Sequence, residues 1–142
     1  SCLIKAKIVE KDEKESGLRV ILNYGHTIGH VIEALGHYRD YPHGRAVAIG
    51  MLVEALIAKE RGLIKQEFIL EIGQLLKICK LNLQMPQAQA AQILDLIKID
   101  KKAKSGKIRL VLPVAAGKVE VFSDISDEEI INACKIFSSQ WP

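Results

Sequence analysis

Apolar residues recur at helical spacing along the first third of the chain. Over residues 3–11 they alternate with lysines, and a charged stretch at 12–17 then interrupts the pattern as a loop. A longer apolar segment runs over 18–35 and ends at Gly36, a usual position for a glycine at a helix C-terminus. The pattern predicts one helix before residue 12 and further helical structure over 18–35.

The middle of the chain contains its most continuous apolar segment. Residues 46–58 are apolar almost throughout and lack the polar face of an amphipathic surface helix, so we expect a buried central helix that ends at Gly62. Apolar positions recur at helical spacing again over 68–79. Pro86 is expected to open a shorter helix over 88–97.

The pattern changes after residue 98. Two runs rich in β-branched residues, 107–112 and 118–122, are joined by residues 113–117 and predict a small hairpin. Ser126 followed by Glu129 forms a capping box that predicts the start of a last helix. Its apolar face consists of Ile130, Ile131, Cys134 and Phe137. The expected fold is a single mainly α domain over residues 1–142 with one small β-hairpin.

The composition indicates a globular domain and argues against a nucleic-acid partner. A chain of 142 residues with 49% hydrophobic and 26% charged residues suits one globular domain and excludes disorder. The net charge of +3 is small and scattered, and aromatic residues make up only 5%, so we expect no nucleic-acid partner. The lysine-rich stretch 98–107 is interpreted as a solvated loop before the hairpin.

The cysteines indicate a reducing compartment. Cys2, Cys79 and Cys134 form no CxxC pair, so we expect free thiols, with Cys79 and Cys134 as small buried hydrophobic residues. No signal peptide is recognisable, and no apolar run reaches the roughly 18–20 residues of a membrane span. We therefore expect a soluble cytoplasmic protein with no membrane partner. Because Ser1 is not a methionine, we expect further sequence upstream.

All four histidines fall within residues 23–43. His26 and His30 are four residues apart, which places both rings on one face of a helix. His43 follows a loop that can fold back onto that face, whereas His37 is expected to be solvated. A catalytic zinc takes three protein ligands and keeps one position open, so two or three imidazoles would need a carboxylate from elsewhere. The spacing alone also fits histidines that bind no metal.

Three glycines accompany this cluster. Gly25 and Gly29 flank the histidine pair and would let another group approach the helix closely. Gly44, directly after His43, is expected to let the next helix begin tightly against the same site.

These residues together resemble the 3-dehydroquinate synthase family. The matching segments are 17–19 (GLR), 22–30 (LNYGHTIGH), 43–44 (HG) and 46–51 (AVAIGM), with further matches at 4–5, 12–13, 100–102, 112–113 and Gly117. The resemblance covers nearly the whole chain in order. It implies the mainly helical C-terminal domain of such an enzyme, which binds metal and substrate.

The resemblance also assigns roles to single residues. It implies that His26 and His43 are ligands of Zn²⁺ or Co²⁺, and that the third ligand is a glutamate upstream of Ser1. It implies that His30 is catalytic without binding metal, and that Glu15 acts as an acid or base. The implied substrate contacts are Lys5, Arg19, Asn23 and one of Lys101 and Lys102, the last facing a phosphate.

The implied reaction is the NAD- and zinc-dependent conversion of 3-deoxy-D-arabino-heptulosonate 7-phosphate to 3-dehydroquinate and phosphate, a lyase step of the shikimate pathway of aromatic amino-acid biosynthesis. NAD is expected to bind mainly to an N-terminal domain, since the 142 residues contain no glycine-rich dinucleotide fingerprint. The partner expected for the chain is thus a small sugar phosphate, the whole enzyme is expected to be a homodimer, and the chain alone is expected to be inactive.

Two alternatives remain open at the level of sequence. One is another sugar-phosphate cyclase, such as 2-deoxy-scyllo-inosose synthase, although Arg19 and Lys5 favour a substrate with a carboxylate. The other is a non-catalytic helical domain that binds a metal or a partner. One residue departs from the family pattern: Arg45 stands where the family usually has a glutamate. We expect this charge beside His43 to weaken the binding of a divalent cation.

Overall fold

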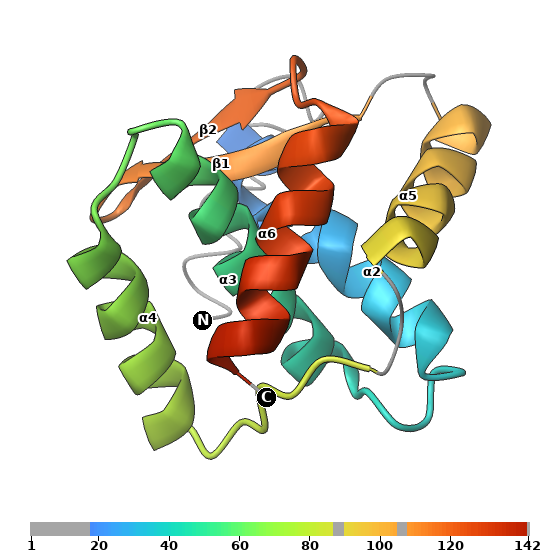
Figure 1. The fold of residues 1–142 in the computed structure, drawn as a ribbon, viewed down its shortest axis with the longest axis horizontal. Coiled ribbons are helices and arrows are strands. Elements are labelled where there is room, and N and C mark those ends of the chain that lie inside the picture. Colours follow the sequence, from blue (N-terminus) through green and yellow to red (C-terminus); the bar gives the residue numbers. More distant parts are fainter. Residues whose placement is uncertain (1–17, 87–89, 105–107, 142) are drawn as a thin grey trace.

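The structure is a computed structural model that describes residues 18–86, 90–104 and 108–141, with the backbone alone described at 18, 19 and 100–104. Its elements, in chain order, are the 3₁₀ helix η1 (Leu18–Asn23), α2 (His26–Leu35), α3 (His43–Glu60), α4 (Gln66–Ile78), α5 (Ala90–Lys104), β1 (Leu110–Ala115), β2 (Lys118–Phe122) and α6 (Asp127–Gln140). The mainly α fold with one hairpin is confirmed (Figure 1). The helix predicted over 3–11 lies outside the described residues.

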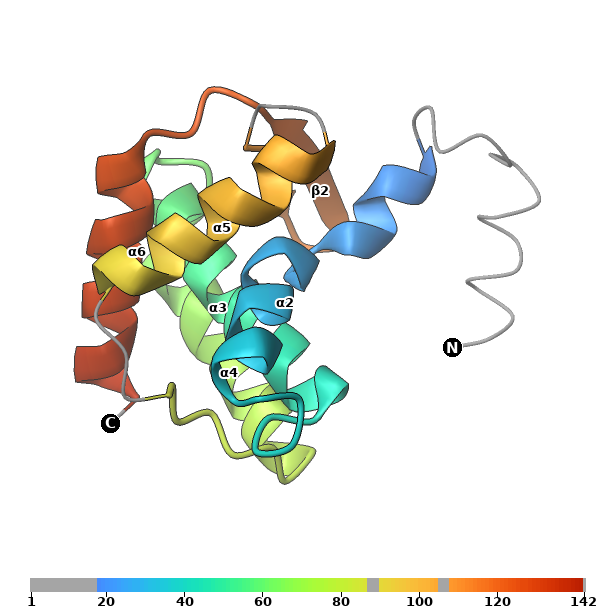
Figure 2. The same ribbon diagram turned by 90° about the vertical axis from the view of Figure 1, so that its right-hand side faces the viewer.

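Helix α3 is the centre of the fold. It packs against α2, α4, α6 and β1, and Figures 1 and 2 show it enclosed by these elements. Its residues from Leu52 to Ala58 are all buried, which confirms the buried central helix. The helix begins at His43, three residues earlier than predicted, and thereby places His43 on its first turn.

The segment 18–35 forms two helices, Leu18–Asn23 and His26–Leu35. Gly25 has a φ of 78° and separates η1 from α2, because only a residue without a Cβ adopts this left-handed conformation at no cost. Helix α2 then ends at Leu35, directly before Gly36, as predicted.

Helix α5 extends further than the sequence pattern indicated. The prediction of a solvated loop over 98–107 is wrong for residues 98–104, which continue the helix to Lys104. The apolar periodicity ends near Ile97, but the residues that follow include several good helix formers, and the next glycine is Gly106. The helix therefore continues as a polar, lysine-rich end.

The hairpin has a tighter turn than predicted. Pro113 lies inside β1, opposite Val119, and a register irregularity follows between Pro113 and Ala115. The turn is made by Ala116 and Gly117, and Gly117 has a φ of 74°. A two-residue turn with a positive φ suits the right-handed twist of paired strands, so the strands extend to meet it.

The last helix begins as predicted. The Ser126 hydroxyl accepts from the Glu129 N–H, and the Glu129 carboxylate accepts from the Ser126 N–H, which completes the capping box. Phe137 and Cys134 are buried on its inner face, and burial raises the pKa of the Cys134 thiol to about 12.

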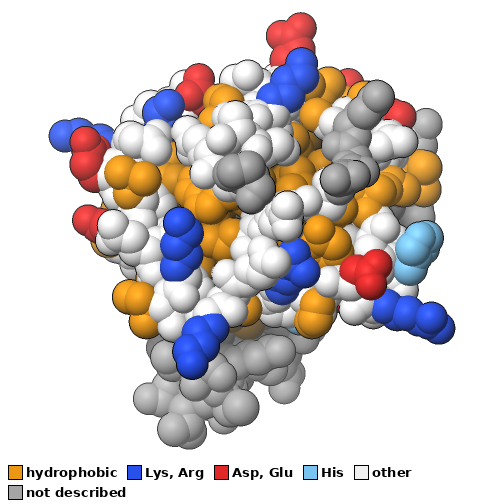
Figure 3. All heavy atoms as spheres, turned by 60° about the horizontal axis from the view of Figure 1, so that its bottom comes forward, with side chains coloured by type: hydrophobic (Ala, Val, Ile, Leu, Met, Phe, Trp, Pro, Cys, Tyr) orange, Lys and Arg blue, Asp and Glu red, His pale blue; other side chains and the backbone are white. Residues whose placement is uncertain are grey.

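The prediction that Cys79 is buried is wrong. This residue forms the C-cap of α4, beyond the buried Leu76, and is exposed. In the part of the chain that the structure describes, no helix combines the length and apolar character needed to cross a bilayer. Figure 3 shows that Lys and Arg side chains are dispersed among hydrophobic and polar ones on one face of the molecule.

Candidate metal centre

Two helices bring three imidazoles together. Helix α2 carries His26 and His30 one turn apart, and His43 begins α3 beside them. The ring centroids are 5.3 Å apart for His26 and His43, 5.8 Å for His26 and His30, and 6.1 Å for His30 and His43. The expected convergence is therefore present. His37 is exposed, as expected, and is not part of these ring pairs.

Close contact between the main chains of α2 and α3 sets this arrangement. A Cβ at Gly50 would lie 2.1 Å from the carbonyl oxygen of Gly25, and one at Gly29 would lie 3.1 Å from the Cα of Val47. Gly25 and Gly29 do clear space, as predicted, and α3 fills that space. The prediction for Gly44 is wrong: a Cβ there would have no neighbour within 4 Å.

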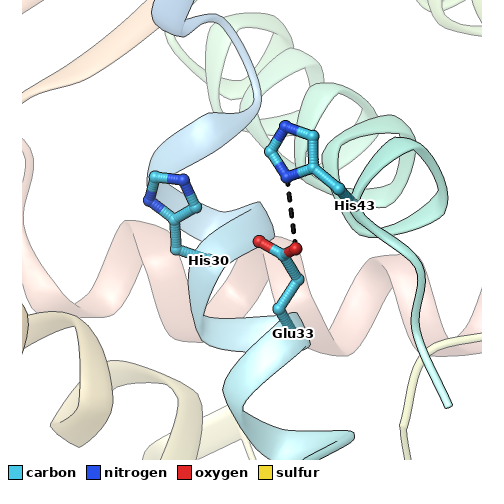
Figure 4. A group of neighbouring side chains, drawn as sticks. All are labelled: His30, Glu33 and His43. Carbon is cyan, nitrogen blue, oxygen red and sulfur yellow. Dashed lines mark hydrogen bonds and ion pairs between the residues drawn. The ribbon is translucent and has the colours of Figure 1, made fainter. Parts of the chain in front are cut away.

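The Nδ1 atoms of the two predicted metal ligands both face oxygen acceptors. His26 Nδ1 lies 3.2 Å from the carbonyl oxygen of Tyr24, and His43 Nδ1 lies 3.2 Å from Oε1 of Glu33 (Figure 4). A carbonyl or carboxylate oxygen can only accept, so each Nδ1 carries the proton in the neutral ring. Nε2 of each ring then keeps the lone pair that a metal needs.

Glu33 is a site residue that the sequence reasoning missed. It follows His26 and His30 on α2 at a spacing of seven and three residues, which places it on the same face. One potential ligand atom from each of His30, Glu33 and His43 lies within 4.8 Å of the others. The sequence signal was that Glu33 continues the face of His26 and His30 by one further helical turn. This spacing points to a shared site only when His43 is known to lie against the same face.

A buried carboxylate anchors the start of α2. Glu54, on the otherwise apolar face of α3, has no exposed surface and accepts a hydrogen bond from the Gly25 N–H at 2.7 Å. The Tyr24 hydroxyl donates to the carbonyl oxygen of Met51 at 2.8 Å. Burial, and secondarily the charge of Glu54, raises the pKa of Tyr24 far above its ordinary value, so this residue is a neutral donor.

The remaining predicted site residues are only partly described. Asn23 is exposed at the end of η1, three residues before the start of α2. Arg19 lies in η1, and Lys101 and Lys102 lie in α5, but their side chains are outside the described part. Lys5 and Glu15 lie outside the described residues altogether. Their roles stay predictions.

Each nitrogen of the Arg45 guanidinium donates to a main-chain oxygen. Nε donates to the carbonyl of Asn82 at 2.8 Å, and the two Nη atoms donate to those of Asp40 and Gln84, each at 3.1 Å. The group also stacks on the ring of Tyr41, 4.1 Å from its centroid. Arg45 thus ties the loop before His43 to residues 82–84, and its predicted effect on cation binding stays a prediction.

The donor set fits a borderline cation such as Zn²⁺. Imidazole nitrogen is a preferred zinc ligand, and the rings of His26 and His43 lie 5.3 Å apart between their centroids on the packed helices α2 and α3. Hydrogen bonds from the distal ring nitrogens to oxygen acceptors are the usual support of zinc-binding histidines.

Most of the chain matches one family of known proteins. The sequence model of a family described as 3-dehydroquinate synthase C-terminal matches residues 1–103. The 3-dehydroquinate synthase of Caldanaerobacter subterraneus subsp. tengcongensis is 47% identical over 135 residues, and that of Dictyoglomus turgidum is 45% identical over the same length. Each match covers 95% of this chain and 38% of the relative. The chain thus spans well under half the length of these relatives.

Two solved structures share the fold. The 2-epi-5-epi-valiolone synthase ValA from Streptomyces hygroscopicus subsp. jinggangensis, solved with NAD⁺ and Zn²⁺ bound, superposes with a TM-score of 0.82 at 20% identity, covering 94% of this chain and 37% of its own. A 2-deoxy-scyllo-inosose synthase, complexed with carbaglucose-6-phosphate, NAD⁺ and Co²⁺, gives a TM-score of 0.76 at 24% identity, covering 95% and 38%. At these identities the likeness concerns the fold alone.

Proposed function

The chain belongs to the 3-dehydroquinate synthase family, and from this premise we propose that it is the metal- and substrate-binding part of a 3-dehydroquinate synthase. The whole enzyme would convert 3-deoxy-D-arabino-heptulosonate 7-phosphate to 3-dehydroquinate and phosphate. The observation that carries the proposal is the convergence of His26, His30 and His43, with Nδ1 of His26 and of His43 held by oxygen acceptors.

In this proposal Nε2 of His26 and Nε2 of His43 hold Zn²⁺ or Co²⁺. The bound cation supplies Lewis-acid polarisation of the substrate oxygens. The third protein ligand in this proposal is a glutamate from the part of the enzyme that precedes this chain. Support comes from the tautomers that Tyr24 and Glu33 select and from the fixed spacing of α2 and α3.

The other residues bind the substrate and move protons. His30 is exposed beside the two metal ligands, where an imidazole can transfer a proton to or from the substrate. Glu15 is a second proton-transfer group in the proposal. Arg19 and Lys5 suit a substrate with a carboxylate and a phosphate, since Arg binds such groups bidentately and Lys acts as a point charge. Asn23 and one of Lys101 and Lys102 complete the substrate contacts.

NAD is assigned to the whole enzyme and to no residue of this chain. The described part contains one antiparallel two-stranded sheet, whereas the usual dinucleotide-binding unit has parallel strands and a glycine-rich turn. We further propose that the whole enzyme is a cytoplasmic homodimer that binds neither nucleic acid nor membranes. Light scattering of the purified enzyme tests the dimer directly.

The decisive experiment measures phosphate release by the whole natural protein that contains this chain, with NAD and Zn²⁺ supplied. We expect His26→Ala and His43→Ala to abolish turnover. His30→Ala should lower kcat by about 10²- to 10⁴-fold with little change in KM, since a proton-transfer group acts in the transition state. Arg19→Ala should in addition raise KM, because it removes a substrate anchor.

His37→Asn is the matched control, because His37 lies in the same region of the chain but is exposed and has a φ of 50°, which asparagine also tolerates. Its activity should be unchanged. If the enzyme turned over glucose 6-phosphate and not the heptulosonate phosphate, the proposed substrate would be wrong, and the alternative of a 2-deoxy-scyllo-inosose synthase would be favoured. Full activity in His43→Ala would refute the metal centre.

A further inference from the structure

Glu33 and His43 form a hydrogen-bonded pair across the two site helices. Oε1 of Glu33, on α2, lies 3.2 Å from Nδ1 of His43, on the first turn of α3, and Figure 4 shows the carboxylate directed at that ring nitrogen. The Glu33 side chain is only 13% exposed, whereas the His43 side chain is 57% exposed. The carboxylate is therefore the fixed member of the pair, and the imidazole is the member that needs a partner to hold it.

The position of His43 explains this need. It is the first residue of α3, follows Pro42, and has no side-chain cap beneath it. An exposed histidine at a helix start would otherwise rotate about its side-chain bonds and divide its proton between Nδ1 and Nε2. A ring protonated on Nε2 cannot offer that atom to a metal.

We infer that Glu33 is a positioning residue, which holds the proton of His43 on Nδ1 and directs Nε2 toward the cation. This inference rests on the proposed metal site. Glu33 acts on His43 as the carbonyl oxygen of Tyr24 acts on His26. Each proposed ligand thus has its own oxygen acceptor, one on α2 and one directly before it. A carboxylate partner of this kind also orients the ring of a zinc-binding histidine and thereby supports its bond to the cation.

Imidazole ¹⁵N spectra of the metal-free whole protein test the orientation without any metal. We expect the wild-type His43 ring to carry its proton on Nδ1, and Glu33→Ala to show a mixture or excess of the Nε2–H form. In Glu33→Gln, the amide oxygen can still accept from Nδ1, so the wild-type tautomer should largely persist. An unchanged His43 tautomer in Glu33→Ala overturns the inference.

Metal titration gives the second readout. Glu33→Ala should weaken Zn²⁺ binding by about 10- to 100-fold, the usual loss for such a partner, and Glu33→Gln should lose less. Glu60→Ala removes an equivalent charge from the exposed end of α3 and should change the affinity less than about twofold. Should Glu33 instead bind the metal itself, Glu33→Gln would lose as much as Glu33→Ala, and Zn²⁺ would shift the Nδ1 signal of His43.

The same titration separates this inference from the proposed function. His26→Ala and His43→Ala should nearly abolish Zn²⁺ binding. If they do while Glu33→Ala binds normally, the metal site stands and the positioning role falls. If neither histidine matters for Zn²⁺, the proposed metal site falls, and the spectra of the metal-free protein still decide what Glu33 does to His43.

Discussion

At the scale of single residues, Arg45 contributes a bond network that its sequence position did not indicate. Its guanidinium donates to carbonyl oxygens of Asp40, Asn82 and Gln84 and stacks on Tyr41. Each of the three acceptors meets a different nitrogen of the guanidinium, which suits the fork of an arginine and not the point charge of a lysine. The side chain therefore ties the loop before α3 to residues 82–84.

We expect Arg45→Ala to lower the free energy of unfolding by about 1–3 kcal/mol, because several hydrogen bonds from a charged donor are lost. Arg45→Lys should recover only part of this loss. Urea unfolding followed by circular dichroism measures both. Arg39→Ala, at an exposed position in the same loop, is the control and should change stability by no more than about 0.5 kcal/mol. Equal effects of Arg45→Ala and Arg39→Ala would show that the network contributes nothing.

The sequence could not reveal this role because the acceptors are main-chain atoms. Asn82 and Gln84 are 37 and 39 residues away from Arg45, and no side-chain pattern marks a carbonyl as an acceptor. Glu33 was missed for a related reason, since its partner His43 comes from another helix. By contrast, the Ser126 and Glu129 box was predictable because both partners lie within one turn.

At the scale of elements, the crossing of α2 and α3 is the contact that positions the site. Gly25 and Gly29 on one side face Val47 and Gly50 on the other, with the main chains in direct contact. The apolar pattern predicted the buried helix, and the residue types predicted space near the histidines. The crossing itself could not be predicted, because the presence of a glycine in the sequence does not identify the segment of main chain that packs against it.

We expect Gly50→Ala to lower the free energy of unfolding by about 3 kcal/mol, since its Cβ would lie 2.1 Å from the carbonyl oxygen of Gly25 and 2.9 Å from the Gly29 nitrogen. The helices must separate to accept it. Gly44→Ala, in the same helix, adds a Cβ with no neighbour within 4 Å and should leave stability unchanged or slightly higher. Denaturant unfolding of the two variants side by side gives the comparison, and similar values for both would contradict the crossing described above.

At the scale of the whole molecule, an ion-pair network ties the end of α3 to the start of α6. Arg61 donates to Glu129 at 2.5 Å and 3.1 Å and to Asp124 at 3.1 Å, and its guanidinium lies over the ring of Phe122. The hydrogen bond from Arg61, with the Ser126 bonds of the capping box, lowers the pKa of Glu129 from 4.5 to about 2. The network thus joins the central helix, the hairpin and the last helix.

This lowered pKa makes stability depend on pH. Because Glu129 has a lower pKa in the folded state, its ionised form stabilises the fold above about pH 4.5, and this stabilisation is lost as the pH falls toward 2. We expect Glu129→Gln to lose about 2–3 kcal/mol at pH 7 and much less near pH 2. Urea unfolding over this pH range measures the difference. Asp124→Asn removes a partner of the same Arg61 that is 74% exposed, and should cost less than about 1 kcal/mol at any pH. A pH-independent loss in Glu129→Gln would contradict the ion pair.

The glycine crossing has a further consequence for how this site tolerates change over evolutionary time. Close contact here is largely main chain against main chain, with the Met51 side chain also lying against Gly25, so the distance between the two histidine-bearing helices depends little on the rotamers of other core side chains. We expect substitutions elsewhere in the core to alter the stability of the domain more than the relative positions of its histidines. We expect such a site to persist through extensive divergence of the surrounding sequence, and an engineer to be free to replace most of the core while the imidazoles stay where they are.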